Sequence, residues 1–397
     1  MRENWTYKKL GECFPYIKNG ANIKQIKDAK GYPITRIETL SGGVFNRDRM
    51  GYADIFDINK FQDYLIEDGD LLMSHINSKT YIGRTVKYIS KNNEKIIHGM
   101  NLLRLKSNES LILSSFFKFY TDSWHFKTDI ARIRKDAVNQ SSFAISDLKN
   151  FRIPLPSLSE QQAIVSELDK INELISLKKA QLSDLDALAQ SIFYDMFGDP
   201  IENEKGWEVK KLDDICVSIV RGPFGSALKK EFFVKPDGTT YKIYEQKHAI
   251  QKNAAIGSYY ITEERFRELS RFELRPYDII MSCSGTIGEL YRLPSNTERG
   301  IMNQALLKFT LNNNICYEYF YRMMEYMKHY FTVRGSGLQN IGSVKIIKSM
   351  LFGLPPLSLQ QDFAKRIELI EQQKAQISST IKDLETLLAS RMQYWFD

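Results

Sequence analysis

IPLPSLSEQQAIVSELDKINELISLKKAQLSDLDALAQSIFYDMFGD, residues 153–199, is the stretch that decides the fold. Pro154 and Pro156 end any strand or helix before it. Ser159 lies three residues ahead of Gln162, which is the spacing of a capping box and predicts the start of a helix. A helix of roughly 38 residues, starting at this cap, would be about 57 Å long at about 1.5 Å per residue.

One face of this expected helix is apolar. Its apolar residues recur in alternating steps of four and three, which is the heptad pattern of a coiled coil. The stripe consists of Ile164, Leu168, Ile171, Ile175, Leu182, Leu185, Ala189, Ile192 and Met196, with Lys178 at its one polar position. Gly198 and Pro200 predict the end of the helix. A helix of this length with one apolar stripe needs a partner.

The partner lies in the same chain, because residues 354–397 repeat the stretch at an offset of 199. Ser358 falls on Ser159 and Gln360 on Gln161, and the stripe is repeated as well. Its members are Phe363, Ile367, Ile370, Ile377, Ile381, Leu384, Leu388 and Trp395, with Lys374 and Arg391 at polar positions. The first helix leads from one globular part to the next, so the second must run back along it, and we expect an antiparallel pair. Lys178 and Lys374 would then either snorkel out of the stripe or lock its register.

The repeat extends over the whole chain. GDLLMS at residues 69–74 matches YDIIMS at 277–282, LLRL at 102–105 matches LLKF at 306–309, and Gly20 falls on Gly222. A period near 200 residues indicates two duplicated domains rather than a solenoid. We therefore expect globular domains at 1–152 and 200–352, a central helix at 153–199 and a C-terminal helix at 353–397.

Composition agrees with a globular protein, at 43% hydrophobic and 26% charged residues. The start, MRENWTYKKL, has no apolar segment of a signal peptide, and no apolar run is long enough to span a membrane. Four scattered cysteines are expected to be buried thiols rather than disulfides or zinc ligands. These features predict a cytoplasmic protein.

Positive charge is concentrated in the two globular parts. Residues 1–152 hold 25 Lys and Arg against 17 Asp and Glu, and residues 200–352 hold 22 against 17. The two helical stretches hold 3 against 8 and 5 against 6. Basic domains on a neutral-to-acidic frame suggest a polyanion held at two places, although an inherited excess of lysine would look the same.

Within each globular part, short β-rich runs alternate with turn residues. DLLMS, TVKYIS and NLLRLKS in the first copy, with DIIMSCSG and ALLKFTL in the second, predict strands of a curved sheet. One amphipathic helix is expected near 111–130 and another near 317–331, with aromatic residues that fill the core. The predicted fold is α+β: two pseudo-two-fold related globular domains joined by two long antiparallel helices.

Basic and amide side chains on the predicted strands and turns are candidates for DNA binding. Arginine pairs best with guanine, and Asn or Gln with adenine, whereas lysines more often contact phosphates. The candidates in the first copy are Arg36, Arg47, Arg49, His75, Asn77, Lys79, Arg84, Arg132, Arg134, Lys135 and Asn139. Those in the second are Arg221, Lys229, Lys230, Gln246, Lys247, Ser284, Arg292, Arg334, Ser336 and Asn340. Each alone is as compatible with plain solvated surface.

Catalytic motifs are missing from the sequence. It has no GxxxxGK[ST] phosphate loop and none of the cofactor and target-base motifs of an adenine methyltransferase. Asp237 with Glu245 and Lys247 imitates the metal cluster of many nucleases, but the spacing is short for two adjacent strands. We therefore expect no catalytic residues and no metal site, and a stand-alone methyltransferase or nuclease is disfavoured.

Two tandem units, each ending in a proline-rich run and an S-x-x-Q helix start, resemble the specificity subunit of type I restriction-modification systems. The resemblance covers essentially the whole chain. Its most specific parts are residues 153–162, LPPLSLQQ at 354–361 and YDIIMSCSGTIG at 277–288. The first copy departs from the family pattern S-x-x-G-x-[IV]-G, because residues 74–83 read SHINSKTYIG.

The resemblance implies that each domain is a target-recognition domain for one half of an asymmetric, two-part sequence in double-stranded DNA. The helices would be spacers that set the unread gap. Two methyltransferase subunits would dock, and through them the restriction subunits, and S-adenosylmethionine, ATP and Mg²⁺ would bind those partners rather than this chain. A different possibility is a coiled-coil adaptor with two protein-binding modules, which explains the duplication but not the charge distribution.

Overall fold

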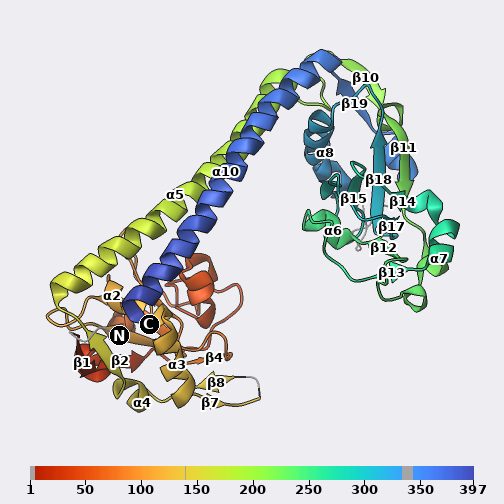
Figure 1. Ribbon diagram of the computed structural model, residues 1–397. Helices are drawn as coiled ribbons and strands as arrows, with labels where there is room; N and C mark the ends of the chain where they lie inside the picture. Colours follow the sequence, from red (N-terminus) through yellow and green to blue (C-terminus); the bar gives the residue numbers. More distant parts are fainter. Residues whose placement is uncertain (1–4, 139, 333–342) are drawn as a thin grey trace. The chain divides into compact units, whose positions relative to one another are not determined.

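The computed structural model describes residues 5–138, 140–332 and 343–397. The chain divides into two compact units, Met1–Lys179 with Ser378–Asp397, and Ala180–Ile377. Each unit holds one globular domain and part of two long helices, α5 (Leu158–Phe197) and α10 (Leu357–Phe396) (Figure 1). Within the described residues, no helix combines the length and the apolar character that a membrane span requires.

The long helices pair in an antiparallel manner, as predicted. In the first unit the carboxylate of Glu167 in α5 accepts hydrogen bonds from Arg391 and from Trp395 Nε1 (3.1 Å) in α10. In the second unit the ring of Phe363, near the start of α10, lies 5.2 Å from that of Phe197 at the end of α5. Every position of the two predicted stripes is buried or half-buried.

The start of α5 differs from the predicted capping box. The helix begins at Leu158, and Ser157 Oγ accepts the hydrogen bond from the Glu160 amide at 3.3 Å, so Gln162 stays exposed. The neighbouring Gln161 is fully buried instead. Its amide nitrogen donates to the carbonyls of Leu111 (2.9 Å) and Pro156 (3.0 Å), and its oxygen accepts from the Leu113 amide (2.8 Å).

The second repeat has the same arrangement around Gln360, which is also fully buried. Gln360 donates to the carbonyls of Asn314 (3.3 Å) and Pro355 (2.9 Å) and accepts from the Cys316 amide (2.9 Å). We call Gln161 and Gln360, with these backbone partners, the glutamine clamps. Because buried polar groups need partners, each clamp ties its domain to the start of a long helix.

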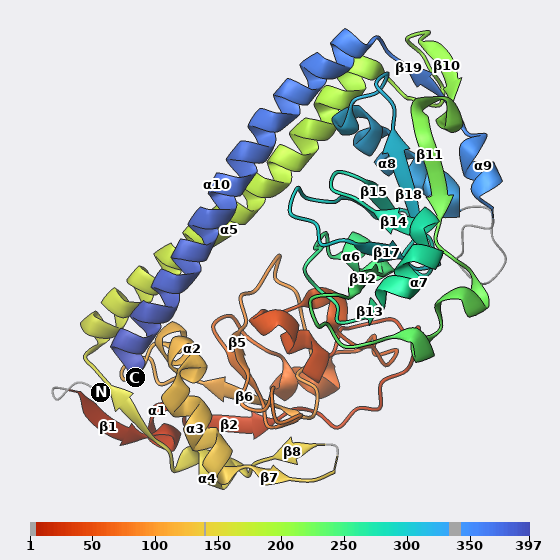
Figure 2. The ribbon, with the colours of Figure 1, turned by 45° about the vertical axis from the view of Figure 1, so that its right-hand side comes forward.

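The described strands of the first domain form three small sheets. β1 (Thr6–Lys9) pairs with β9 (Arg152–Leu155); the second sheet has the order β2 (Tyr16–Asn19), β6 (Leu102–Lys106), β3 (Leu71–Ser74), β5 (Thr85–Lys87); and the third is β4 (Ile76–Asn77), β8 (Ser141–Ser142), β7 (Lys135–Asp136). Figure 2 labels β1, β2, β5, β6, β7 and β8 among them. The helices are α1 (Leu10–Cys13), α2 (Ser114–Asp122), α3 (Trp124–Ile133) and α4 (Ile145–Lys149), with 3-10 helices η1 (Ile37–Gly43), η2 (Arg47–Arg49) and η3 (Asn59–Tyr64).

The second domain repeats the first two sheets in the same strand order, which confirms the duplication. β10 (Glu208–Lys211) pairs with β19 (Leu351–Leu354); the next sheet is β11 (Cys216–Arg221), β18 (Leu306–Leu311), β15 (Ile279–Ser282), β16 (Leu290–Arg292); and the third is β13 (Tyr260–Ile261), β12 (Tyr241–Tyr244), β17 (Gly300–Met302), β14 (Glu273–Leu274). The helices are α6 (Gln246–Ile250), α7 (Glu263–Glu268), α8 (Tyr317–Thr332) and α9 (Val344–Lys348), with η4 (Leu212–Ile215), η5 (Gly225–Leu228), η6 (Lys230–Phe232) and η7 (Ser270–Phe272).

The third sheet of the second domain has a reduced counterpart in the first. There, Ile34 bridges in parallel to Ile97 and antiparallel to Gly51, and Leu65 bridges antiparallel to Ile97. In the second domain β12 pairs in parallel with β17 and antiparallel with β13, and β14 pairs antiparallel with β17. The first domain therefore keeps the connectivity of this sheet as isolated bridges.

Gly20 and Gly222 match in sequence because the backbone passes very close to each. A Cβ at Gly20 would lie 2.2 Å from the His98 carbonyl oxygen, and one at Gly222 would lie 1.9 Å from that of Asn303. No side chain fits at either position.

The prediction of a single helix near residues 111–130 is wrong, because the structure has two helices there. Ser123 has an extended conformation (ψ 158°), and its side chain accepts from the Phe126 amide at 3.2 Å, so it ends α2 and caps α3. The counterpart near 317–331 is the single helix α8. Their aromatic residues fill the cores as expected, with Phe116, Phe117, Tyr319 and Phe320 buried.

Candidate nucleic-acid interface

Three of the predicted DNA-binding residues line one pocket of about 500 Å³ in the first unit. Lys79 and Arg84 come from the loop between β4 and β5, and Arg134 follows α3. The pocket also contains Lys127 of α3, which the sequence analysis missed. We call this group of four residues the cationic pocket.

Lys127 was missed because only the aromatic residues of this amphipathic helix were considered, and these were assigned to the core. A helical period places residues seven apart on one face, so the spacing between Lys127 and Arg134 was the signal that could have revealed it.

Asp136 holds two of the cations together. Its carboxylate forms ion pairs with Lys79 (3.0 Å) and Arg134 (2.8 Å) and accepts a hydrogen bond from Ser141 Oγ (2.6 Å). The Ser141 hydrogen bond, followed by those from Lys79 and Arg134, lowers the pKa of Asp136. This group therefore keeps its negative charge and fixes β7 against the loop that follows β4.

The other two cations of the pocket are not paired with a carboxylate of any described residue. Arg84 lies over the ring of Tyr81, with 4.2 Å between the guanidinium carbon and the ring centroid, and Nη1 donates to the Leu40 carbonyl at 3.4 Å. Lys127 is exposed and forms no ion pair within the described part of the chain. Asp122, which also lines the pocket, is paired with Lys118 outside the pocket lining. The pocket therefore keeps an excess of positive charge.

Other candidates of the first domain lie apart from the cationic pocket. Arg47 is held by Glu94, with Nε 3.0 Å from the carboxylate, and this hydrogen bond raises the pKa of Arg47. Arg36 pairs with Glu38 at 3.2 Å. These two arginines serve mainly local structure. Three more candidates are exposed: Arg49, Lys135 and Arg132, the last of which pairs with Asp129.

His75 and Asn77 lie at the junction of β3 and β4. His75 is buried, and burial lowers its pKa, so the ring is neutral near pH 7. Its Nδ1 is buried and has no hydrogen-bond partner within the described structure. Asn77 donates to Ser74 Oγ at 3.3 Å and accepts from the Ser78 amide at 2.8 Å. His75 is therefore packed inside rather than presented to a duplex.

In the second domain, Gln246 opens α6 beside the loop that contains Ser284. A Cβ added to Gly285 in this loop would lie 3.9 Å from Gln246 Nε2. The Gln246 Oε1 atom is buried and has no hydrogen-bond partner within the described structure. Lys247 pairs with Glu245 at 2.6 Å. Gln246 and Ser284 are thus brought together, with an unsatisfied amide beside an exposed loop.

The remaining described candidates of the second domain do not converge on that loop. Arg221 donates to the Gln304 carbonyl at 3.2 Å and stacks on Phe224. Lys229 pairs with Glu231 at 3.4 Å, and Lys230 is exposed. Four candidates lie outside the described residues: Asn139, Arg334, Ser336 and Asn340.

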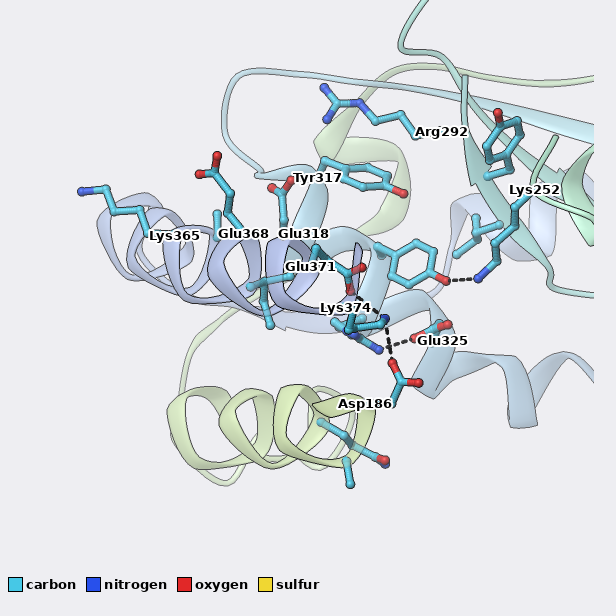
Figure 3. A pocket seen from close by; sticks show the side chains of 18 of the residues that line it. Asp186, Lys252, Arg292, Tyr317, Glu318, Glu325, Lys365, Glu368, Glu371 and Lys374 are labelled. Carbon is cyan, nitrogen blue, oxygen red and sulfur yellow. Dashed lines mark hydrogen bonds and ion pairs between the residues drawn. The ribbon is translucent and has the colours of Figure 1, made fainter. Parts of the chain in front are cut away.

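A groove of about 1200 Å³ in the second unit runs between α8, β16 and the long helices (Figure 3). Lys374 of α10 reaches across its floor to Asp186 of α5 (2.8 Å) and also contacts Glu371 (2.9 Å). Arg292 stacks on Tyr317, with 4.7 Å between the guanidinium carbon and the ring centroid. Arg292 therefore belongs to this groove rather than to the Gln246 loop.

The first unit has a matching groove of about 520 Å³. The clamps align Leu113 with Cys316, so Lys118 and Asp122 of α2 correspond to Tyr321 and Glu325 of α8. Asn172 and Glu385 correspond in the same way to Glu371 and Asp186 at the offset of 199. All eight of these residues line their respective grooves, so the grooves lie at equivalent places in the two repeats. Two of the four pairs keep a carboxylate, Asp122 with Glu325 and Glu385 with Asp186.

Three features bear on the excluded chemistries. Among the described residues, no cluster of three His, Cys, Asp or Glu side chains is arranged to hold a metal ion. Asp237 accepts from Thr239 N (2.9 Å) and Oγ1 (2.8 Å) in a turn, and Glu245 is paired with Lys247. The four cysteines are free thiols, and burial raises the pKa of Cys13 to about 11.

Comparison with known proteins places both repeats in one family. The family model described as "Type I restriction modification DNA specificity domain" matches residues 2–187 and 204–386. A relative from Methanocaldococcus jannaschii, the putative type I restriction enzyme MjaX specificity subunit, is 28% identical over 97% of this chain and 93% of its own length. The MjaIX specificity subunit of the same organism is 26% identical over 61% of this chain and 60% of its own length.

Solved structures share the fold. The S subunit of a type I restriction-modification system from M. genitalium aligns with a TM-score of 0.53 and 16% identity, over all of this chain and 98% of its own. A chain from a study of complex assembly and conformational transition of the type I R-M system aligns with a TM-score of 0.63 and 14% identity, over the same shares. With both repeats matched by the family model, the chain belongs to the type I restriction-modification DNA specificity domain family.

Proposed function

We propose that this chain is the non-catalytic subunit that reads a two-part DNA sequence for a type I restriction-modification complex. The observation that carries the proposal is the duplication, in which two domains share a scaffold but differ in the polar side chains they expose. Equal scaffolds with different surfaces suit two different half-sites, and an asymmetric target follows from two unlike readers.

The basic domains supply the contacts to DNA. Cations such as those of the cationic pocket bind phosphates without regard to sequence, and amides such as Gln246 discriminate bases. Neither domain needs a cofactor for this task, because recognition by hydrogen bonds and charge involves no covalent step.

The two long helices act as the ruler between the half-sites. An antiparallel pair with a continuous apolar stripe resists bending and sliding, because each change of register exposes the stripe to water. The number of unread base pairs is then set by helix length.

The paired grooves are the docking surfaces for two methyltransferase subunits. Each groove is bounded by a long helix pair and by α2 or α8, and the two share corresponding residues. One partner surface can therefore engage both repeats. These partners bring S-adenosylmethionine, and restriction subunits that join through them use ATP and Mg²⁺.

Co-expression of the chain with its methyltransferase partner, followed by genome-wide mapping of modified adenines, tests the proposal. We expect one motif with two specific halves and a gap of constant length. A single uninterrupted motif, or modification that does not depend on this chain, would overturn the two-reader proposal. Persistence of DNA binding at high salt would instead favour the adaptor, because phosphate contacts impose a steep salt dependence.

A second experiment tests the ruler. Four residues inserted after Ala180, matched by four after Ile377, lengthen both helices by one step of the stripe. This adds about 6 Å, or about two base pairs of unread gap at 3.4 Å each. Both half-sites should stay unchanged, and an altered half-site would mean that the helices do not set the gap.

A further inference from the structure

The charge of the cationic pocket is only partly neutralised. Asp136 balances one of the two cations that it holds, and Arg84 and Lys127 are not paired with any carboxylate in the described part of the chain. Asp122 is already paired with Lys118. A concave site with excess positive charge attracts an anion, because its walls focus the field.

The second domain differs at the equivalent place. Gly83 and Gly288 correspond, with φ +80° and +84°, and each closes against the helix behind it, at Ile130 in α3 and Lys328 in α8. The residue after this glycine is Arg84 in the first domain and Glu289 in the second. Glu289 forms an ion pair with Lys328. The second domain therefore neutralises the position that is cationic in the first.

We propose that the cationic pocket seats one backbone phosphate of the half-site bound by the first domain, and that the described residues of the second domain form no such seat, because the Glu289–Lys328 pair lies in place of Arg84. The first domain is then the electrostatic anchor of the complex, and the second contributes a smaller share of the salt-dependent affinity. This inference rests on the proposed function and adds an unequal division of work between the two readers.

The chemistry of the pocket suits a phosphodiester. A guanidinium offers a planar fork of donors that matches two phosphate oxygens, and Arg84 is held in place by the face of Tyr81. Lys127 adds a mobile point charge from α3. Gly43, which also lines the pocket, has no side chain to obstruct entry, and a Cβ there would meet nothing within 4 Å.

The test uses the full chain in complex with its methyltransferase partner and a labelled duplex that carries the mapped target. Lys127 also lines the groove assigned to the methyltransferase partner, so Arg84→Gln is measured alone as well as combined with Lys127→Gln, and assembly of each complex is checked first. The double variant should weaken binding about tenfold and reduce the slope of log affinity against log salt by about 1. The loss should be the same on target and non-target DNA, since phosphates carry no sequence information. The matched control is Glu289→Gln with Lys328→Gln, which removes the charges at the equivalent place and should leave affinity and slope unchanged.

A second arm locates the phosphate. Duplexes with a neutral methylphosphonate at one position at a time should weaken wild-type binding at one phosphate of the first domain's half-site. The Arg84→Gln, Lys127→Gln variant should be insensitive to that substitution, while Arg84→Lys should retain part of the sensitivity. Sensitivity that persists in the Gln variant, or that maps to the other half-site, would overturn the assignment.

Three further outcomes separate the alternatives. Tight binding of inorganic phosphate by the full chain without DNA, lost in the Gln variant, would make the pocket a site for a free phosphate compound and would overturn the DNA assignment. Unchanged DNA binding by the Gln variant would overturn the assignment of the pocket as a phosphate site and would leave the proposed function standing. Failure of the wild-type complex to bind its duplex would instead overturn the proposed function.

Discussion

The two domains agree where they meet the long helices and differ where they face outward. Both have a glutamine clamp, and both bury an acidic residue beside a basic side chain of the neighbouring strand. In the first domain Asp70 lies 2.6 Å from Arg104, and in the second Asp278 lies 3.6 Å from Lys308. The comparison teaches that duplication preserved the contacts that position the domains.

The differences lie in loops and edges. Within the described residues, the Glu289–Lys328 ion pair of the second domain lies where the first domain has Arg84. The sheet of β13, β12, β17 and β14 in the second domain is represented in the first by isolated bridges. Loops on a rigid scaffold tolerate change because few buried contacts depend on them. Divergent sequence preference can therefore evolve without loss of the common frame.

The largest expected change in unfolding free energy comes from two glycine substitutions, which test whether the two domains share one scaffold. Gly20→Ala and Gly222→Ala each force a Cβ against a carbonyl oxygen, so the backbone must move. Each should reduce the free energy of unfolding by about 3 kcal/mol or more. Urea unfolding of the full chain measures the loss, and Gly69→Ser, where a Cβ would meet nothing within 4 Å but φ is +84°, serves as the milder control. A large loss at only one of Gly20 and Gly222 would break the equivalence.

The sequence showed that Gly20 and Gly222 occupy equivalent positions, but it did not show why glycine is needed there. Their match between the copies was visible, but the carbonyls of His98 and Asn303 that make them necessary are about 80 residues away in sequence. The helix pair and the duplication were predictable because periodicity and self-similarity are local or direct signals. The binding site was less predictable from the sequence. Lys79, Arg84 and Arg134 were selected because basic side chains suit DNA, but only the fold shows that they share a pocket with Lys127. The fold alone also shows that Arg47 is held by Glu94.

The glutamine clamps should show the next largest effect. Gln161→Leu removes three hydrogen bonds and leaves the Leu113 amide and two carbonyls buried without partners. We expect a loss of about 3 kcal/mol, and the same for Gln360→Leu. Gln162→Leu and Gln361→Leu, at the exposed neighbouring positions, are matched controls that should change the unfolding free energy little. If the two clamp variants differ widely in urea unfolding, the domains are not attached in the same way.

An intermediate effect is expected from acid. His98 in the first domain corresponds to Met302 in the second, and burial lowers the pKa of His98 to about 4. The unfolded chain, with a histidine pKa near 6.5, binds more protons between pH 6.5 and pH 4, so stability falls as the pH drops through this window. For His98 the loss from pH 7 to pH 5 is about 2 kcal/mol.

His98→Met copies the second domain and should remove this contribution. The variant loses the contact between His98 Nε2 and the Leu102 carbonyl (2.9 Å), which costs some stability at pH 7, but its unfolding free energy should depend less on pH. Buried His75 and His248, whose pKa values are also lowered by burial, contribute to the slope that remains. An unchanged pH dependence in urea unfolding would exclude His98 as a source of acid sensitivity.

The smallest effect concerns the two lysines of the helix stripes, which occupy different positions in the two repeats. Lys374 corresponds to Ile175, and its amine is not simply extended into solvent, because it pairs with Asp186 across the helix interface. A polar group at such a position specifies register at a cost in stability, so Lys374→Leu should raise the unfolding free energy by about 1 kcal/mol. The register role predicts a second consequence: disulfide pairs engineered one helical turn out of register should form more readily in Lys374→Leu than in the wild type. A gain in stability with no change in these cross-links would leave Lys374 as a snorkelling side chain, and the asymmetry of the stripes would then have no bearing on the ruler.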